Sequence, residues 1–532
     1  VSALDDIDGD LTNEISMNIS DVSILSPGTY TLTLGVTDSD GNQTFEQLHL
    51  VVLDTNGPRI ILQNATLRYT IYDDDPDYFS MLVVTDTSGE VFGEENIIID
   101  SSAVNMDQVG VYSVIVTATD SSGNSSQYDI PITVLDPWSP GADFGYYSTG
   151  VDDTICIYRY TGTSKYLIIP EKIDGLTVTC IGEEAFMDES LEEVVLPNTL
   201  NEIQNAAFEN NRLQEIVIPE GITTIESNVF RFNQLTSVTF LGEVTTIGGL
   251  AFYGNEFSNI NLPDSLTTIE ASAFAQNLLS SIDIPESVTE IGSGAFFYNR
   301  LESIVIPAGI TVIEDYTFSL NQLHTVEILG NVTHIGNSAF MENNLESIVL
   351  PDSLLEIGEG AFEHNLLNAI VIPVGVTEIK ESVFHDNNLI SATFLGDVTS
   401  IETMAFWDNQ LTTIALPSTL TFVGDAAFFS NQLESIEIPE GLTTISPGAF
   451  MKNNLRYVTF LGNVTHIEYS AFQDNQIILI DLPDSLITID DGAFANNLLD
   501  AITIPSNVTY LGIGAFTRNN IVSVVFEGTL ET

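Results

Sequence analysis

Residues 335–351 read Ile-Gly-Asn-Ser-Ala-Phe-Met-Glu-Asn-Asn-Leu-Glu-Ser-Ile-Val-Leu-Pro, and this pattern decides the fold of most of the chain. Its phenylalanine returns every 22 residues, so that sixteen units follow one another without an insertion from Phe186 to Phe516. A fixed period in this range is typical of a solenoid, in which each unit buries its apolar side chains only against its neighbours. The sequence therefore predicts a β-rich stack of about sixteen coils, with the phenylalanines forming one continuous spine.

Each unit is expected to contain a short strand and a turn built around asparagine. Ile348 and Leu350 are two residues apart, a spacing that places both side chains on one face of a strand. Pro351 ends that strand, because proline lacks the amide donor. Asparagine stands three residues after the phenylalanine in fifteen of the sixteen units, the exception being Glu189. An amide side chain both donates and accepts, so we expect these asparagines to satisfy buried backbone groups rather than to bind a ligand.

A slower period overlies the repeat of 22 residues. After the strand, a Leu-Gly pair replaces proline at residues 241–242, 329–330, 395–396 and 461–462, at separations of 88, 66 and 66 residues. This rhythm indicates a block of three coils that was duplicated, with one additional coil inserted early.

The residues before the array have a different pattern. Alternating runs at residues 29–34 and 111–116 are each followed by an Asp/Ser/Gly-rich turn and by a second extended run. Such hairpins are the units of β-sandwiches, so we expect two small sandwiches, of which the first begins inside its own domain. Prolines and glycines at residues 137–150 predict a stiff connection. The predicted domains are therefore residues 1–54 (sandwich), 55–136 (sandwich), 137–150 (linker) and 151–532 (solenoid).

The array resembles the BspA-like, treponemal-type leucine-rich repeats, whose units combine a leucine-rich strand, a proline and an Ile-Gly-x-x-Ala-Phe segment. Residues 291–296 and 335–340 match that segment, and residues 160–175 resemble the way such arrays begin. The leading segments resemble bacterial immunoglobulin-like surface domains through residues 6–12 and the Asp-x-x-Gly-Asn turns. The resemblance implies a mainly β chain with two immunoglobulin-like β-sandwiches, followed by a right-handed leucine-rich-repeat solenoid.

The same resemblance implies a secreted or cell-surface bacterial binding protein of the adhesin type, whose partner is a protein or glycan on a host or neighbouring cell. Any signal peptide or anchor is expected to lie outside this chain. Because a fold does not dictate a function, two alternatives stay open. The first is a structural spacer or self-associating surface-layer component. The second, more distant, is an ice-binding adhesin, since threonine stands fifteen residues after the phenylalanine in twelve coils, although exposed strands favour β-branched residues in any case.

Composition excludes several classes of partner. The 532 residues contain 75 Asp and Glu but only 12 Lys and Arg, a formal net charge of −63. This charge repels phosphate backbones and anionic lipid headgroups, so we expect no nucleic-acid partner. No apolar run approaches the length of about 18 residues that a membrane span needs, so we expect no insertion into a bilayer.

No catalytic motif is visible in the sequence. It contains no Gly-x-Ser-x-Gly elbow, phosphate-binding glycine loop, His-Glu-x-x-His or Cys-x-x-Cys. We therefore expect the chain not to be an enzyme and to carry no cofactor, with calcium as the one candidate ion.

Two kinds of candidate metal site are present. Carboxylate oxygens are the ligands that calcium prefers, but alternate aspartates in a turn also accept local hydrogen bonds without a metal. His364 and His385 fall on adjacent coils, with Asp386 and Asp408 in the same column, which is compatible either with a transition-metal site or with an exposed polar column. The candidate calcium ligands are Asp5, Asp6, Asp8 and Asp10, with a second acidic segment at residues 73–77.

Cys156 and Cys180 are the only cysteines, and they are 24 residues apart where one coil has 22. This separation places them on neighbouring strands at the start of the solenoid, in a chain taken to be extracellular. We predict a disulfide that fastens the N-terminal cap; two separate buried thiols are the alternative.

Two surfaces of the array are candidates for ligand binding. Positions seven and nine after each phenylalanine point away from the core and form a strand face. Position one after the phenylalanine forms an aromatic column, in which rings would anchor a partner if they are exposed. We expect binding on the strand face, since aromatic residues mark an interface only where they are exposed. The strand-face residues are Ser303, Val305, Thr325, Glu327, Ser347, Val349 and Val371, and the column contains Trp407 and Phe429.

Overall fold

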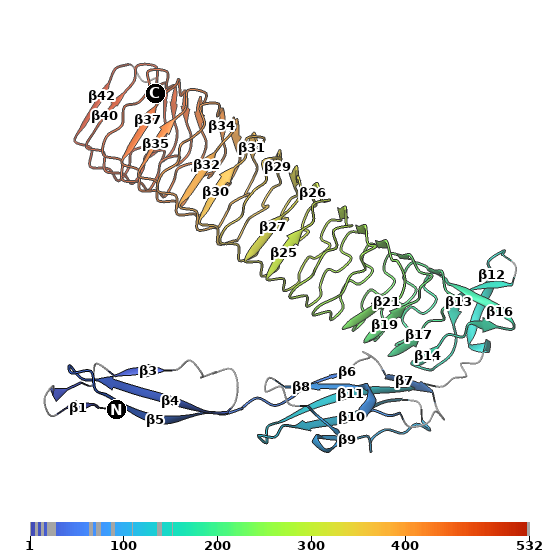
Figure 1. Cartoon of the computed structure of the whole chain (residues 1–532). Helices are drawn as coiled ribbons and strands as arrows, with labels where there is room; N and C mark the ends of the chain where they lie inside the picture. The colour runs from blue at the N-terminus through green and yellow to red at the C-terminus, as the bar shows by residue number, and fades with distance from the viewer. Residues whose placement is uncertain are drawn as a thin grey trace. The chain divides into compact units, whose positions relative to one another are not determined.

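The computed structural model describes residues 2–5, 9–11, 15–18, 28–62, 67–70, 76–86, 91–108, 110–135, 141–151 and 153–528. It divides into two compact units, Val1–Trp138 and Ser139–Thr532. Strands dominate both units, and the helices of the described residues are short 3-10 turns (Figure 1). Within those residues, no helix combines the length and the apolar character that crossing a bilayer demands.

The first domain of the N-terminal unit contains an antiparallel three-stranded sheet of order β3-β4-β5 and a small β1-β2 hairpin in its described part. Leu34 is buried on β4, whereas the side chains of β5 are largely exposed. Residues 6–8, 12–14 and 19–27 lie outside the described residues, so the sandwich expected for residues 1–54 stays a prediction. The strands are β1 (Leu4–Asp5), β2 (Gly9–Asp10), β3 (Ser16–Asn18), β4 (Gly28–Thr37) and β5 (Gln43–Val52).

The second domain packs two sheets around one core. The antiparallel pair β6-β8 faces a four-stranded sheet of order β7-β11-β10-β9, and Ile60, Val114, Val116, Ile130 and Ile132 are buried together. This arrangement is a small β-sandwich, while its assignment as immunoglobulin-like stays a prediction. Its elements are β6 (Arg59–Leu62), β7 (Leu67–Thr70), η2 (Phe79–Met81), β8 (Leu82–Thr85), η3 (Glu94–Asn96), β9 (Ile97–Asp100), β10 (Gly110–Thr119) and β11 (Ser125–Leu135).

A cap of longer strands closes the N-terminal end of the solenoid. Sheet β12-β13-β16-β15 carries Phe144 and Tyr160, whose rings lie 6.3 and 5.6 Å from that of Phe186, the first ring of the spine. Residues 141–148 form η4 and β12 of this cap. The sequence analysis placed them in the linker of residues 137–150, so that part of the predicted linker belongs to the solenoid cap instead. The elements are η4 (Gly141–Asp143), β12 (Phe144–Ser148), β13 (Thr154–Tyr160), β14 (Tyr166–Ile168), β15 (Lys172–Ile173), β16 (Leu176–Ile181), β17 (Glu193–Val195) and β18 (Glu202–Ile203).

A disulfide bridge joins Cys156 of β13 to Cys180 of β16. The two strands are parallel neighbours with these residues directly opposite each other, and both side chains are buried. The bridge therefore ties the outer strands of the cap to the strand that pairs with β18 of the first coil.

Alkylation before and after reduction tests this bridge. When the unsubstituted chain is denatured without reductant, iodoacetamide is expected to modify neither cysteine, because a disulfide sulfur is not a nucleophile. After reduction, mass spectrometry should find both residues modified. Two modified cysteines before reduction would show separate thiols.

The predicted solenoid is confirmed. Each coil contributes a two-residue strand on one side, and many coils add a four-residue strand, here named the main strand, on the other (Figure 1). The main strands are β19 (Glu215–Ile218), β21 (Ser237–Phe240), β25 (Ser303–Ile306), β27 (Thr325–Ile328), β30 (Ala369–Ile372), β32 (Ser391–Phe394), β35 (Ser435–Ile438), β37 (Tyr457–Phe460), β40 (Ala501–Ile504) and β42 (Ser523–Phe526).

The two-residue strands form parallel ladders of three or four along the other side. They are β20 (Thr224–Ile225), β22 (Thr246–Ile247), β23 (Thr268–Ile269), β24 (Glu290–Ile291), β26 (Val312–Ile313), β28 (His334–Ile335), β29 (Glu356–Ile357), β31 (Glu378–Ile379), β33 (Ser400–Ile401), β34 (Phe422–Val423), β36 (Thr444–Ile445), β38 (His466–Ile467), β39 (Thr488–Ile489) and β41 (Tyr510–Leu511).

The phenylalanine spine runs through the core of the solenoid. From Phe186 to Phe516, neighbouring rings lie 5.0–5.8 Å apart and are stacked. The rings belong to one buried cluster, so the burial of each phenylalanine depends on its neighbours in the stack.

An asparagine ladder runs beside the spine and has the structural role that the sequence predicts. Asn365 accepts a hydrogen bond from the amide of Leu345 (3.1 Å) and donates to the carbonyls of Phe340 (2.8 Å) and Phe362 (3.3 Å). The same three bonds recur for other buried asparagines of the ladder, such as Asn343. Each amide thus links two coils and satisfies backbone groups that no sheet reaches.

The three-coil rhythm appears in the sheet of main strands. Main strands are paired two by two, as β25 is with β27. In the coil that follows β27, residues 347–350 lie in no strand. Where Leu329 replaces proline, its amide donates to the carbonyl of Ile306 in the preceding coil (3.0 Å). Pro351 and Pro373 hold the same position in the next two coils and have no amide hydrogen to donate. The ladder of hydrogen bonds between main strands is therefore interrupted on both sides of the coil that contains residues 347–350.

Candidate functional site

The predicted strand face is exposed. All seven of its residues point outward, with Val305, Val349 and Val371 exposed to 47%, 85% and 51%, while Ile304 and Ile306 between them are buried. Ser303 lies opposite Thr325 and Val305 opposite Glu327 on the β25-β27 pair. Ser347 and Val349 lie on the neighbouring coil whose main strand is interrupted. The structure thus brings the predicted residues onto one continuous side of the solenoid.

A groove that the sequence analysis missed lies on the same side. It has a volume of about 450 Å³, and its lining comes from the segments 413–418 and 435–440 and from Leu461. The lining residues are Thr413, Ile414, Ala415, Leu416, Ser418, Ser435, Glu437, Pro439, Glu440 and Leu461. These segments correspond to residues 347–352 and 369–374 one three-coil block earlier, where the main ladder is interrupted. The signal in the sequence is the pair Pro417 and Pro439, which hold the same position in successive coils.

The aromatic column is half-buried. The rings of His385, Trp407 and Phe429 pack in series at 5.2 and 5.1 Å, and the ammonium group of Lys452 lies 5.0 Å from the Phe429 ring. The Nε1 atom of Trp407 is buried without a hydrogen-bond partner among the described residues. These rings bury much of their apolar surface against one another. The strand face is therefore the more accessible of the two predicted surfaces.

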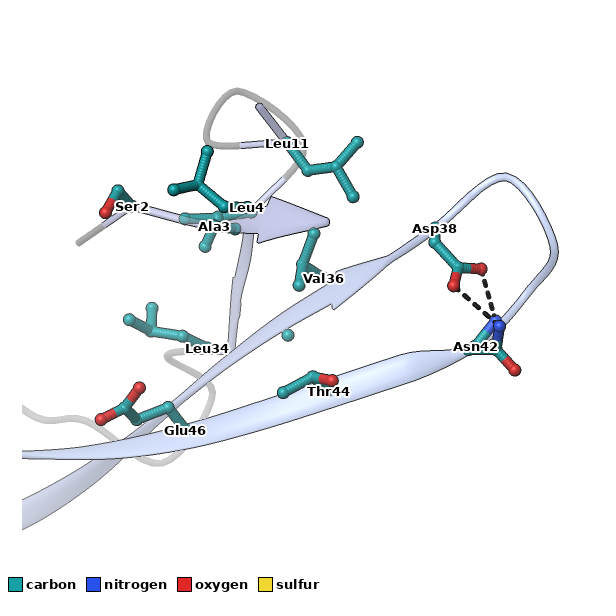
Figure 2. A pocket seen from close by; sticks show the side chains of 12 residues that line it. Ser2, Ala3, Leu4, Leu11, Leu34, Val36, Asp38, Asn42, Thr44 and Glu46 are labelled. Carbon is teal, nitrogen blue, oxygen red and sulfur yellow. Dashed lines mark hydrogen bonds between the residues drawn. The ribbon is translucent and has the colours of Figure 1, made fainter. Parts of the chain in front are cut away.

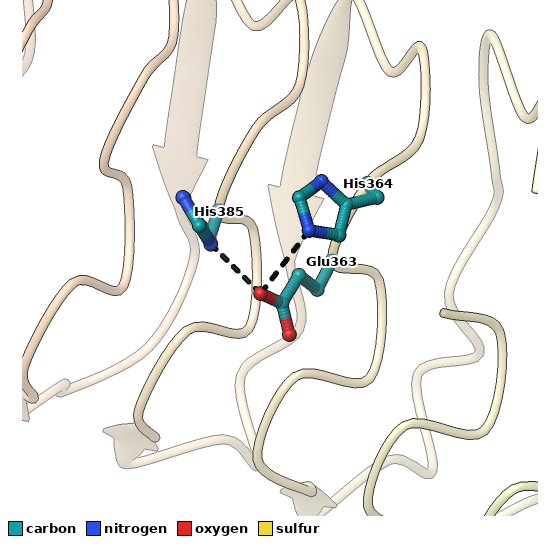
Figure 3. Close-up of side chains that lie close together, drawn as sticks. All are labelled: Glu363, His364 and His385. Atoms are coloured by element: carbon teal, nitrogen blue, oxygen red, sulfur yellow. Dashed lines mark hydrogen bonds and ion pairs between the residues drawn. The ribbon is translucent and has the colours of Figure 1, made fainter. Parts of the chain in front are cut away.

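The two histidines on adjacent coils meet at one carboxylate. His385 Nδ1 lies 2.8 Å and His364 Nε2 lies 3.6 Å from the same Oε1 atom of Glu363 (Figure 3). His364 Nδ1 also lies 2.7 Å from Oδ2 of Asp386. The hydrogen bond from His385 to Glu363 raises the pKa of His385, against the opposing effect of burial, and Asp386 and Asp408 add to the rise.

The threonines that stand fifteen residues after the phenylalanine, here named the threonine rank, include several whose hydroxyl groups donate hydrogen bonds to the backbone. The hydroxyl of Thr333 donates to the carbonyl of Thr311 one coil earlier (3.2 Å), and that of Thr465 donates to Thr443 (3.0 Å). A hydroxyl that donates to the preceding coil does not donate outward, so these threonines have a structural role. The same bond is made by Thr245, Thr267, Thr289, Thr399 and Thr421.

The calcium prediction is only partly within the described residues. Asp6 and Asp8 lie outside them, as do residues 73–75, whereas Asp5 and Asp10 belong to the strands of the β1-β2 hairpin. Calcium binding at these aspartates therefore stays a prediction.

A hollow of about 270 Å³ lies beside that hairpin and is bordered by the first Asp-x-x-Gly-Asn turn (Figure 2). In the turn, Asp38 accepts hydrogen bonds from the backbone amide and from the side-chain amide of Asn42, at 2.8 and 2.7 Å. These bonds lower the pKa of Asp38. The aspartate thus acts as a local hydrogen-bond acceptor, the metal-free role considered for such turns.

A different trio of carboxylates comes together in the structure. Oxygens of Asp54, Asp86 and Asp120 lie within 4.8 Å of one another, a cluster that the sequence analysis did not identify. Asp120 accepts hydrogen bonds from the backbone and side chain of Asn124, as Asp38 does from Asn42. Asp120 is thus a local hydrogen-bond acceptor in its own turn, as Asp38 is.

Three solved bacterial proteins are similar to the chain at low sequence identity. A leucine-rich repeat protein from Bacteroides ovatus is 24% identical, with 71% of this chain and 91% of that chain covered and a TM-score of 0.44. A leucine-rich cell surface protein from Faecalibacterium prausnitzii is 22% identical, with 74% and 95% covered and a TM-score of 0.31. The pneumococcal vaccine antigen PcpA is 20% identical, with 72% and 80% covered and a TM-score of 0.24.

Among curated proteins, the chain is 27% identical over 154 residues to the pesticidal crystal protein Cry22Aa of Bacillus thuringiensis. The match covers 29% of this chain and 21% of that protein, so the chain spans about a fifth of the length of the curated relative it matches.

The family comparison agrees with the repeat seen in the structure. The model of the BspA type leucine rich repeat region (6 copies) matches residues 157–277, 245–366, 355–478 and 423–532. These overlapping matches cover the solenoid from its cap to its last coil, well over half of the chain. With its phenylalanine spine and its 22-residue coils, the chain belongs to the BspA-type leucine-rich repeat family.

Proposed function

We propose that this chain is a secreted or cell-surface bacterial binding protein of the adhesin type, which recognises a protein or glycan through the strand face of its solenoid. The observation that carries the proposal is the outward row of Val305, Val349 and Val371, since exposed apolar side chains in line are what a partner can desolvate. The family, and the cell-surface protein of Faecalibacterium prausnitzii among its structural neighbours, support the location.

The charge of the chain supports the choice of partner. A net charge of −63 disfavours nucleic acid and anionic membrane, whereas uncharged serine, threonine and valine dominate the strand face. A strip with few charged residues on an acidic molecule suits a broad protein or glycan surface that makes many weak contacts. The proposed role is binding rather than catalysis, with no cofactor required.

A triple substitution tests the strand face. The variant Val305→Lys, Val349→Lys, Val371→Lys is expected to weaken binding to a purified matrix protein or glycan by at least about tenfold, because three charges then oppose desolvation of the interface. The whole chain would be immobilised and screened against a panel of such ligands by surface plasmon resonance, with and without calcium.

The matched control adds the same three charges on the other side of the solenoid. Val312→Lys, Leu355→Lys and Thr377→Lys replace exposed residues in or directly before the two-residue strands and should leave binding unchanged. If the strand-face variant keeps full affinity while Trp407→Ala loses it, the site belongs to the aromatic column. If no ligand in the panel binds saturably and self-association increases with calcium, the structural spacer or surface-layer role is favoured instead.

A further inference from the structure

Two adjacent coils bring two carboxylates and two imidazoles into one cluster on the surface of the solenoid. Glu363 and His364 come from one coil, and His385 and Asp386 from the next. Acid and imidazole alternate in an open series from His385 to Asp386. Glu363 contacts both histidines (Figure 3), and His364 contacts Asp386.

We propose that Glu363, His364 and His385 bind a divalent transition metal ion of the Zn²⁺ class. One ligand atom from each residue lies within 4.8 Å of the others. Tetrahedral ligands at about 2.0–2.2 Å from zinc are separated by roughly 3.4 Å. The distances from Glu363 Oε1 to the two imidazole nitrogens, 2.8 and 3.6 Å, bracket that separation. An ion between the three groups therefore requires only small side-chain shifts.

Asp386 completes the arrangement as a positioning residue. Its Oδ2 atom holds Nδ1 of His364, which leaves Nε2 turned toward Glu363. Metal-binding histidines commonly donate their second nitrogen to a carboxylate, which fixes the tautomer and the orientation of the ring. Asp386 therefore prepares His364 to present a lone pair to the metal.

The backbone that carries these side chains is held in place by the stack. The amide of His364 donates to the carbonyl of His385 (3.0 Å), and that of Asp386 donates to the carbonyl of Trp407 (2.9 Å). Both donors have left-handed φ angles, 53° and 52°, at the same turn of successive coils. Ligands on such a repeated turn are preorganised, so little conformational freedom is lost when an ion binds.

The donor set selects the metal. Two imidazole nitrogens and one carboxylate suit zinc and its neighbours, whereas calcium takes oxygen ligands alone. His364 and His385 have side-chain exposures of 39% and 19%, so the ion is reached from solvent. Three protein ligands leave a fourth position for water or for a group from a partner.

Titration of the metal-stripped whole chain with Zn²⁺ tests this site. We expect one ion to bind per chain in isothermal titration calorimetry, with a millimolar excess of Ca²⁺ unable to displace it. In the double variant His364→Ala, His385→Ala this binding should be lost, and Asp386→Asn should weaken it by about tenfold or more. Co²⁺ at the site should give the intense visible absorption of tetrahedral cobalt, a signature that scattered surface carboxylates do not produce.

The matched control is His334→Ala, which removes a histidine that faces Glu356 at 3.6 Å without a second imidazole beside it. This variant should bind Zn²⁺ as the native chain does. Because the substituted side chains are partly exposed, the metal-free variants should melt as the native chain does. Equal Zn²⁺ affinity in the native chain and the double variant, or a cobalt spectrum without tetrahedral bands, overturns the proposal.

Discussion

Replacing Phe340 with alanine is expected to lower the free energy of unfolding by about 3–5 kcal/mol, because a buried aromatic ring leaves a cavity that its surroundings fill only in part. The ring is fully buried, and its neighbours Phe318 and Phe362 both lie 5.5 Å away, held by their own coils. Neither can move into the space without leaving its own stacking partner. The loss should appear as a lower urea midpoint of the whole chain.

Amide hydrogen exchange should locate the effect. In a solenoid each coil contacts only its neighbours, so protection should fall first in the coils of Phe318, Phe340 and Phe362. The control is Tyr298→Ala, which removes an aromatic ring that is 58% exposed and should change stability by less than about 0.5 kcal/mol. Equal midpoints for the two variants would contradict the assignment of the spine as the core.

The second large effect is expected from Asn343→Asp. The amide group of Asn343 donates to the carbonyls of Phe318 (2.9 Å) and Phe340 (3.1 Å) and accepts from the amide of Leu323 (2.9 Å). A carboxylate in its place turns an acceptor toward two buried carbonyl oxygens. Leaving buried polar groups unsatisfied beside a charge should cost about 2–5 kcal/mol at neutral pH.

The pH dependence of this loss separates it from a packing defect. At about pH 4 a larger fraction of the introduced carboxyl group is protonated and can donate one of the missing bonds, so the difference from the native chain should shrink. Asn344→Asp is the matched control, since Asn344 is the adjacent residue, lies only half-buried and is not part of the ladder. A stability deficit of the same size in both variants would argue against the structural ladder.

The solenoid and its internal bonding are predictable from the sequence because the same physical demand is repeated in every coil. A ring that must be covered by the next coil recurs at the position of Phe340, and an amide that must satisfy two carbonyls recurs at that of Asn343. The separation between Cys156 and Cys180 likewise follows from the length of a coil. The threonine rank shows the limit of such patterns, since composition alone did not reveal that its hydroxyls donate to the preceding coil.

The N-terminal part of the chain is predictable only as strands and turns. Phe144 and its neighbours lie in a Pro- and Gly-containing stretch that indicates a linker, yet they pair with β13 in the cap. Whether a short segment forms a strand depends more on the strand it can pair with than on its own β-propensity.

By itself, the sequence determined the stacked coils, the phenylalanine spine, the asparagine ladder and which residues of the main strands face outward, since each follows from a period that backbone geometry imposes. Only the tertiary structure decided which side chains meet across coils. The contact of Glu363 with both His364 and His385, and the groove beside Pro417, depend on side-chain torsions and on which backbone amides can donate to the preceding coil. Those are properties of the assembled stack, because a single coil has no neighbour with which to form them.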